Sequence, residues 1–184
     1  MLLTGWVPRC SRLRHGFPHF LPHFRVMSTW QNPEQWKRWV RGEGCPICES
    51  VATGAAVAEL EVSRVMMSED APMRGYAWLP FRRHAVELHE LTDPEGAAFM
   101  RDIRRVSHAI AAATDAVKLN YEIHGNTVPH LHLHIFPRYV GDPFESGPID
   151  PRAVEGPVYH GEEFASLVAR VLRALHATPG ADGT

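Results

Sequence analysis

Residues 126–138 read NTVPHLHLHIFPR, a stretch in which three histidines alternate with apolar residues. Successive side chains of a β-strand point to opposite faces, so the pattern predicts a strand with His130, His132 and His134 on one face and apolar residues on the other. At a rise of about 3.3 Å per residue, neighbouring histidines stand about 6.6 Å apart, close enough to act on one phosphate-sized group. The prolines at both ends of the run disfavour a helix.

The alternation alone leaves three interpretations open. Imidazole has an ordinary pKa of roughly 6.5, which suits proton transfer, metal binding and nucleophilic attack near neutrality. The row could be a polar strand face, a metal site formed by two or three histidines, or a nucleophile with hydrogen-bond donors beside it. The residues that flank the strand decide between them.

Periodicity elsewhere predicts an α+β fold. Thr92 and Glu95 form a capping-box pattern, and apolar residues from Phe99 to Ala113 recur at steps of three and four, which predicts one long amphipathic helix. The other predicted elements are a helix from an Asn32 cap to about Arg41, a turn-rich segment 42–50, one or two strands in 57–67, strands 76–80 and 119–123, a loop 141–157 and a C-terminal helix 162–177.

The length of 184 residues predicts one domain, which we assign to residues 27–177. Residues 1–26 contain four arginines and no acidic residue. That composition is typical of a disordered leader, or of sequence upstream of a start at Met27. Residues 178–184 are predicted to be a frayed tail.

Composition excludes several classes of partner. The 19 basic and 21 acidic residues nearly balance, so we expect no broad basic face and no nucleic-acid partner. No stretch approaches the roughly 20 apolar residues of a membrane span. Three cysteines, with Cys45 and Cys48 in a tight pair, make a poor disulfide framework, which favours a reducing compartment and a cytoplasmic protein.

Residues 125–138 resemble the active-site segment of the histidine triad (HIT) superfamily, in which His-x-His-x-His is followed by apolar residues. The upstream segments 82–84 (Arg-Arg-His) and 87–92 (ELHELT) resemble the residues that precede the family's long helix. The resemblance covers residues 44–140. It implies a HIT-like fold, with an antiparallel sheet, one long helix and a C-terminal helix, and a homodimer that buries the long helix and the sheet.

In that family the middle histidine is the nucleophile, so the resemblance implies that His132 attacks the α-phosphorus of a nucleoside phosphate and forms a nucleotidyl-histidine intermediate. A protonated His134 would stabilise phosphate charge, and His130 completes the triad. The implied substrate is a dinucleoside polyphosphate such as diadenosine tetraphosphate, or a nucleoside phosphoramidate. The alternatives are a nucleotide-binding regulatory module with little turnover and a zinc protein whose triad binds the metal.

The resemblance also implies substrate contacts. Asn126 and Thr127 occupy positions at which the family contacts phosphate oxygens, and Asp70 resembles a ribose-contacting acid. Arg138 could fork onto phosphate oxygens or form an ion pair, and the turn aspartate could instead cap its own backbone. Tyr76 stands where the family often has a further histidine, and Asn126 where glutamine is commoner. These departures leave the leaving group, and water or phosphate as the acceptor, open.

Cys45 and Cys48 form a CxxC pair, and two thiolates at this spacing can bind one zinc ion that needs two more ligands. The pair alone also fits buried free thiols or a redox pair. Zinc-containing HIT proteins and the related galactose-1-phosphate uridylyltransferases complete such a pair with histidines that correspond here to His84 and His130. The resemblance therefore implies a structural zinc ion, with His89 as the competing ligand.

Overall fold

The computed structural model describes residues 29–52, 56–154 and 156–177. The predicted leader, residues 1–26, and the predicted tail, residues 178–184, lie outside these ranges. Within them the chain combines helices with small antiparallel sheets, which confirms the α+β class. None of the described helices is long and apolar enough to cross a membrane.

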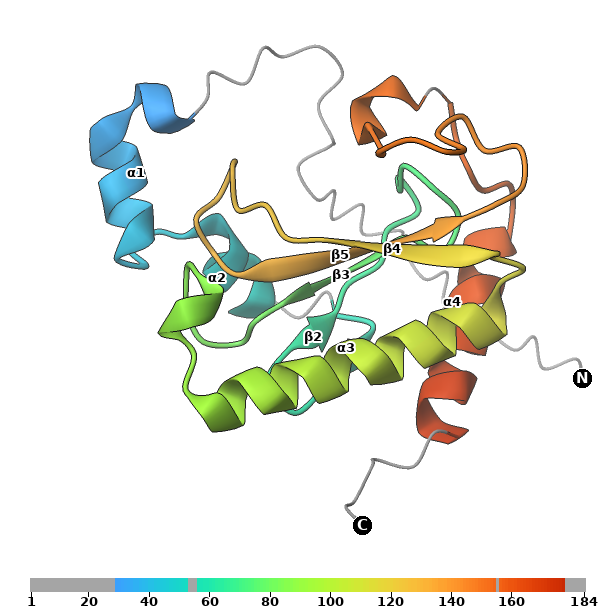
Figure 1. The fold of residues 1–184 in the computed structure, drawn as a ribbon, viewed down its shortest axis with the longest axis horizontal. Coiled ribbons are helices and arrows are strands. Elements are labelled where there is room, and N and C mark those ends of the chain that lie inside the picture. Colours follow the sequence, from blue (N-terminus) through green and yellow to red (C-terminus); the bar gives the residue numbers. More distant parts are fainter. Residues whose placement is uncertain (1–28, 53–55, 155, 178–184) are drawn as a thin grey trace, which may run out of the picture.

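A three-stranded antiparallel sheet holds the histidine segment at its centre (Figure 1). Its strand order is β3 (Ala77–Pro80), β5 (His132–Arg138) and β4 (Lys118–Glu122). Trp78 and Glu122 both pair with His134, from opposite sides of β5. Residues from two distant parts of the chain therefore border the central strand.

The alternation predicted for the histidine strand is confirmed from His132 onward. Leu133 and Ile135 are buried on one face, whereas His132 and His134 are only partly buried on the other. His130 lies before the first residue of β5, and its ring is fully buried in a separate cluster. The expected row of three imidazoles is thus a pair on the strand and one histidine next to it.

The long helix α3 (Asp93–Ala113) covers the apolar face of the sheet (Figure 1). It begins as predicted, because the Thr92 backbone N–H donates to Glu95 Oε2 at 2.9 Å. The helix α4 (Glu163–Ala177) packs on α3 and also agrees with its prediction. The buried residues of the two helices recur at helical spacing: Ala98, Phe99, Asp102, Ile103, Val106, Ala109, Ile110 and Ala113 on α3, and Leu167, Val171 and Leu175 on α4.

One acidic residue lies inside this core. Asp102 on α3 is 1% exposed, and its carboxylate accepts from the backbone N–H groups of Val62 and Ser63, both at 3.0 Å, and from Ser63 Oγ at 2.8 Å. These bonds attach α3 to the turn between β1 (Ala58–Glu59) and β2 (Arg64–Val65). The segment predicted to hold one or two strands therefore contains two, and Asp102 holds their turn in place.

The N-terminal part differs from its prediction in one element. The helix α1 (Pro33–Val40) begins as expected, with Asn32 Oδ1 accepting from the Gln35 N–H at 3.1 Å. The segment predicted as turns contains a helix, α2 (Pro46–Ala52). Proline suits the first helical position, and apolar side chains at the start of α2 pack near Trp78. Tertiary packing stabilises a helix too short to show a periodic pattern.

The remaining described segments are irregular, as predicted for residues 141–157. Short 3₁₀ turns interrupt the irregular segments at Thr29–Gln31 (η1), Leu88–Glu90 (η2) and Pro151–Ala153 (η3).

Candidate active site and metal centre

His132 has a fixed ring orientation. Its Nδ1 lies 2.5 Å from the backbone carbonyl oxygen of His130. A carbonyl only accepts hydrogen bonds, so Nδ1 carries the ring proton and Nε2 keeps a free lone pair. Burial lowers the pKa of His132 below its ordinary value, which keeps the ring neutral near pH 7. A neutral imidazole with an unprotonated Nε2 is the form that can attack an electrophile.

His134 lies beside this ring on the same face of β5. The ring centroids of His132 and His134 are 4.8 Å apart, and Tyr76 Oη lies 2.7 Å from His134 Nδ1. Burial first, and then the neighbouring His132 and His124, lower the pKa of His134 to about 3. In the substrate-free chain the His134 ring is therefore neutral, whereas the family resemblance implied a protonated ring beside a bound phosphate. A buried imidazole among other imidazoles gains too little from a second proton to hold it.

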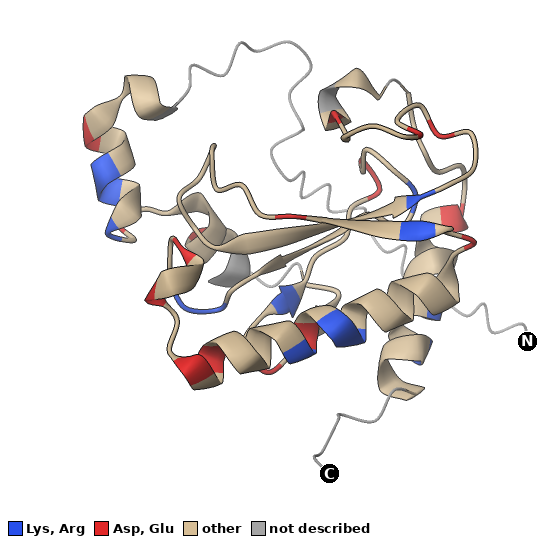
Figure 2. Cartoon of the chain, in the orientation of Figure 1, with Lys and Arg blue, Asp and Glu red and all other residues tan. Residues whose placement is uncertain are grey.

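One acidic residue borders this pair, because Glu122 on β4 lies opposite His134. β3, and β5 as far as Pro137, contain no Lys, Arg, Asp or Glu (Figure 2). The Trp78 ring stands edge-on to His132, with centroids 5.9 Å apart, and Glu122 on β4 pairs with His124 at 2.8 Å. A phosphate at this face would depend on neutral hydrogen-bond donors rather than on ion pairs.

A second cluster of four side chains lies next to the strand. The ligand atoms of Cys45, Cys48, His84 and His130 all lie within 4.8 Å of one another. His130 Nδ1 is 3.6 Å from Cys45 Sγ and 3.4 Å from Cys48 Sγ. His84 Nδ1 is 3.4 Å from Cys48 Sγ. These are the four residues predicted to be ligands, and together they could hold a metal ion.

Both histidines of this Cys₂His₂ cluster present an unprotonated nitrogen to the sulfurs. His130 Nε2–H donates to the Phe81 carbonyl at 2.8 Å, and His84 Nε2–H donates to the Val40 carbonyl at 3.1 Å. Their Nδ1 atoms therefore have free lone pairs, which is how backbone carbonyls orient metal-binding histidines. Burial lowers the pKa of His130 to about 4, so the ring stays neutral.

The spacing of the donors also fits a tetrahedral zinc site. Zinc–sulfur bonds of about 2.3 Å and zinc–nitrogen bonds of about 2.05 Å give sulfur–nitrogen edges of about 3.6 Å. The observed sulfur–nitrogen distances are 3.4 to 3.6 Å. Two cysteines and two histidines are a common donor set for structural zinc, so the residues present fit this ion.

The other predicted site residues are more exposed. Asn126 and Thr127 are exposed in the loop that leads into β5. Asp70 is exposed in the loop before β3, where its backbone N–H donates to Ser68 Oγ at 3.2 Å. His89 is exposed in η2 and does not belong to the Cys₂His₂ cluster. The structure thus brings Asn126 and Thr127 to the start of the histidine strand.

Arg138 is engaged away from the histidine pair. Its Nε and one terminal nitrogen donate to the two carboxylate oxygens of Asp142, each at 2.8 Å, and the guanidinium also reaches the carbonyls of Phe144 and Gly147. Arg138 is 8% exposed and lies six residues beyond His132, about 20 Å along an extended strand. The predicted contact with phosphate finds no support in this geometry, whereas the alternative, an ion pair, is observed.

The sequence did not indicate a role for Tyr76, which counted only as a departure from the family pattern. Its hydroxyl meets His134 because β3 and β5 pair in a register that puts both side chains on one face. His124 also lies near the pair, with its ring centroid 6.2 Å from that of His134. The alternation of side chains in the predicted strand 76–80 could have indicated that Tyr76 and Trp78 share one face of the sheet.

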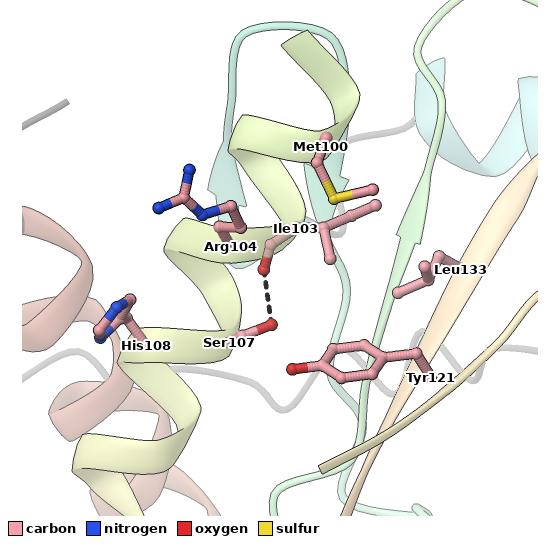
Figure 3. A pocket seen from close by; sticks show the side chains of 7 residues that line it. All are labelled: Met100, Ile103, Arg104, Ser107, His108, Tyr121 and Leu133. Carbon is pink, nitrogen blue, oxygen red and sulfur yellow. Dashed lines mark hydrogen bonds between the residues drawn. The ribbon is translucent and has the colours of Figure 1, made fainter. Parts of the chain in front are cut away.

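On the opposite face of the sheet, a groove of about 500 Å³ separates α3 from β4 (Figure 3). Met100 and Tyr121 border it and are 57% and 49% exposed, although both are large apolar side chains. The residues that line the groove are Met100, Ile103, Arg104, Ser107, His108, Tyr121 and Leu133. Because Leu133 points away from the histidine face, the groove and the imidazole pair are separate features.

The geometry agrees with what the chain is similar to. The family model described as HIT domain matches residues 49–141. Adenosine 5'-monophosphoramidase hnt1 of Schizosaccharomyces pombe is 26% identical over 130 residues, which cover 67% of this chain and 96% of that protein. Bis(5'-adenosyl)-triphosphatase of Saccharomyces cerevisiae is 34% identical over 73 residues, 35% of each chain.

Solved structures share the fold. The crystal structure of histidine triad protein blr8122 from Bradyrhizobium japonicum aligns with a TM-score of 0.58 and 33% identity, over 65% of this chain and 89% of that one. The alignments with the phosphoramidase and with the Bradyrhizobium japonicum structure cover nearly the whole length of both proteins. The match to the triphosphatase spans about a third of that protein.

Proposed function

The chain belongs to the HIT domain family, and from that premise we propose that it is a nucleotide hydrolase or nucleotidyl transferase in which His132 is the nucleophile. The carrying observation is the 2.5 Å contact between His132 Nδ1 and the His130 carbonyl, which leaves Nε2 free to attack. The substrate is a nucleoside phosphoramidate or a dinucleoside polyphosphate. The names of the two relatives, a monophosphoramidase and a triphosphatase, support these two classes.

The reaction proceeds in two displacements at the α-phosphorus. In the first, His132 Nε2 forms a bond to phosphorus while the bond to the leaving group breaks: a phosphate leaves as its anion, and an amine leaves with a proton taken from solvent. The product is a nucleotidyl-histidine, whose Nδ1–H still donates to the His130 carbonyl. In the second, water or another acceptor attacks phosphorus and gives its proton to solvent, the bond to Nε2 breaks, and the nucleotide is released with the original ring restored.

Donors close to the attacking nitrogen bind the phosphate oxygens. His134 is neutral, so it contributes one ring N–H rather than a positive charge. We assign Asn126 and Thr127 to phosphate contacts because they are exposed in the loop that enters β5. We assign Asp70 to a contact with the ribose, and the family resemblance is what supports this assignment. Neutral donors preorganised at a developing oxyanion stabilise it without rearrangement.

The Cys₂His₂ cluster binds one structural zinc ion. Such an ion would join the segment before α2 to the start of β5, and it would leave His132 free because His132 is not among its four ligands. Cys45 and Cys48 act as thiolates in that role, so a reducing, cytoplasmic setting is proposed. The near balance of basic and acidic residues argues against a nucleic-acid partner.

The groove between α3 and β4 is the interface of a homodimer. Among the described residues, β4 is an outer strand of the three-stranded sheet, with no strand on its other side. Two large apolar residues at the border of the groove are exposed, Tyr121 at 49% and Met100 at 57%. A second copy would cover both the apolar groove and the unpaired edge.

Product analysis tests the proposed function. Wild-type protein and the His132→Ala variant are incubated with adenosine phosphoramidate and with diadenosine polyphosphates, each with and without added phosphate. Conversion by the wild type alone supports His132-dependent chemistry, and the products identify the bond that breaks and the acceptor. Tight nucleotide binding without conversion by either protein would replace the proposal with a regulatory binding module.

A further inference from the structure

Tyr76 makes a hydrogen bond to the imidazole pair, and the proposed chemistry gives it no role. Ala77 pairs with Ile135, so Tyr76 comes opposite Phe136 at the entrance to β3, with its side chain on the histidine face. Its ring lies 4.9 Å from that of Phe136 and stacks on that of His134 at 5.9 Å and 19°. This packing delivers the hydroxyl to His134 Nδ1, 2.7 Å away.

The direction of this hydrogen bond follows from the two groups. A phenol O–H is the better donor, and an unprotonated imidazole nitrogen is the better acceptor. Burial first, and then the charge of Glu122, raise the pKa of Tyr76, so the phenol keeps its proton. The neutral ring of His134 therefore accepts at Nδ1, and its own proton resides on Nε2.

We infer that Tyr76 is a positioning residue: its hydroxyl holds the His134 ring in the orientation and tautomer in which Nε2–H donates toward the phosphorus centre that His132 attacks. The inference deepens the proposed function, since the acceptor of that N–H is a phosphate oxygen or the leaving atom of the substrate. The hydrogen bond itself needs no substrate.

The two histidines thereby become complementary. His132 donates from Nδ1 to a backbone carbonyl and presents a lone pair at Nε2. His134 accepts at Nδ1 from Tyr76 and presents an N–H at Nε2. One ring can attack while the ring beside it, at a centroid distance of 4.8 Å, donates. Without the Tyr76 hydroxyl, the His134 ring could flip or exchange its tautomer, and either change removes the donor.

Tyr76 does not act as a proton relay in this arrangement. A relay would move the phenolic proton to His134 Nδ1 as Nε2–H is given up. That transfer leaves a phenolate in a buried site that Glu122 already makes unfavourable for negative charge. The hydroxyl is a fixed donor that never gives up its proton. Its removal therefore lowers kcat only partly and does not abolish turnover.

The test compares Tyr76→Phe, which keeps the ring and removes only the hydroxyl, with Tyr159→Phe. Tyr159 is a matched control because its buried hydroxyl accepts from the Gly75 N–H at 2.7 Å, next to Tyr76 in the chain but bonded to backbone. Nitrogen-15 NMR of the histidine rings reports the protonation of His134 directly, in the absence of nucleotide. Steady-state kinetics with adenosine phosphoramidate report the catalytic effect.

In the wild type we expect His134 to be protonated at Nε2, with an Nδ1 signal shifted by the Tyr76 hydrogen bond. Tyr76→Phe moves that signal toward a free ring nitrogen and lowers kcat about three- to tenfold, with KM changed less than about twofold. Tyr159→Phe alters neither. A wild-type His134 protonated at Nδ1, or a His134 signal unchanged in Tyr76→Phe, overturns the inference even if the protein turns over no substrate. Equal losses of kcat in both variants also overturn it.

Discussion

His132 Nδ1 and the carbonyl oxygen of His130 lie 2.5 Å apart, so the residue that orients the proposed nucleophile also belongs to the Cys₂His₂ cluster. The His130 side chain faces Cys45 and Cys48, while its backbone faces His132. The two sites are therefore adjacent and share one residue. A metal that holds His130 in place would steady the nucleophile without touching it.

Zinc binding is expected to depend on the cysteine pair. Purified wild-type protein should contain about one zinc ion per chain, measured by atomic emission, and Cys45→Ser should lose most of it. Thermal unfolding of Cys45→Ser should occur about 5–10 °C lower, because a structural ion binds only the folded chain. His89→Ala is the control. His89 is exposed and lies outside the cluster, so this variant should retain the ion. Full zinc content in Cys45→Ser would contradict the assigned ligands.

The ion pair of Arg138 with Asp142 should make stability depend on pH in an acidic window. The Arg138 guanidinium holds the pKa of Asp142 down to about 2, from an ordinary value of 3.8. A lowered native pKa means that the contribution is complete above about pH 5 and is lost as the pH falls from about 4 towards 2. Asp142→Asn should lower the free energy of unfolding at pH 7 by about 2 kcal/mol.

Urea unfolding of the wild type and Asp142→Asn between pH 7 and pH 3 measures this effect, and the difference should shrink on acidification. Glu61→Gln is the control, because Glu61 pairs with Arg101 at the surface, where ion pairs contribute little. A difference that stays constant down to pH 3 would show that the carboxylate charge is not the source.

The buried carboxylate of Asp102 should matter more than any one of its partners. Asp102→Ala leaves the backbone N–H groups of Val62 and Ser63 without an acceptor and should lower the free energy of unfolding by about 3 kcal/mol. Ser63→Ala removes a single donor, the hydroxyl at 2.8 Å, and should cost about 1 kcal/mol. Chemical unfolding gives both values. Equal losses of unfolding free energy in the two variants would contradict this account. They would mean that Asp102 stabilises the fold through the Ser63 hydroxyl and not through the backbone N–H groups of the turn.

The proposed dimer makes a prediction for the groove between α3 and β4. Met100→Glu places a charge on its apolar border and should convert a two-chain mass in sedimentation equilibrium to a single-chain mass. Val140→Glu is the matched control, because Val140 is 82% exposed and lies outside the groove. A wild type that sediments as one chain, or a Met100→Glu that remains a dimer, would rule out this interface.

Local patterns in the sequence predicted the elements that depend on local spacing. Alternation predicted β5, and the Thr92–Glu95 box with its apolar stripe predicted α3. The helix α2 was missed because seven residues are too few to show a period, and because packing rather than propensity stabilises it.

Site contacts across strands were harder to foresee. Tyr76 and His134 are 58 residues apart and meet only through the register of β3 with β5. Arg138 was a candidate for phosphate because a guanidinium can fork onto phosphate oxygens, but its partner Asp142 lies in an irregular loop whose path the sequence does not specify. The four cluster residues were identified through the family resemblance, since a CxxC pair alone does not reveal which histidines face it.

The most direct test of the proposed chemistry is to isolate the covalent intermediate. Protein mixed with adenosine phosphoramidate or a diadenosine polyphosphate labelled at the α-phosphate is quenched within milliseconds, denatured and digested, and the labelled peptide is sequenced by mass spectrometry. We predict a nucleotidyl group on the peptide that contains His132, absent from His132→Ala. Product formation by the wild type with no label on the protein at any time, or with the label on another residue, would contradict His132 as the nucleophile.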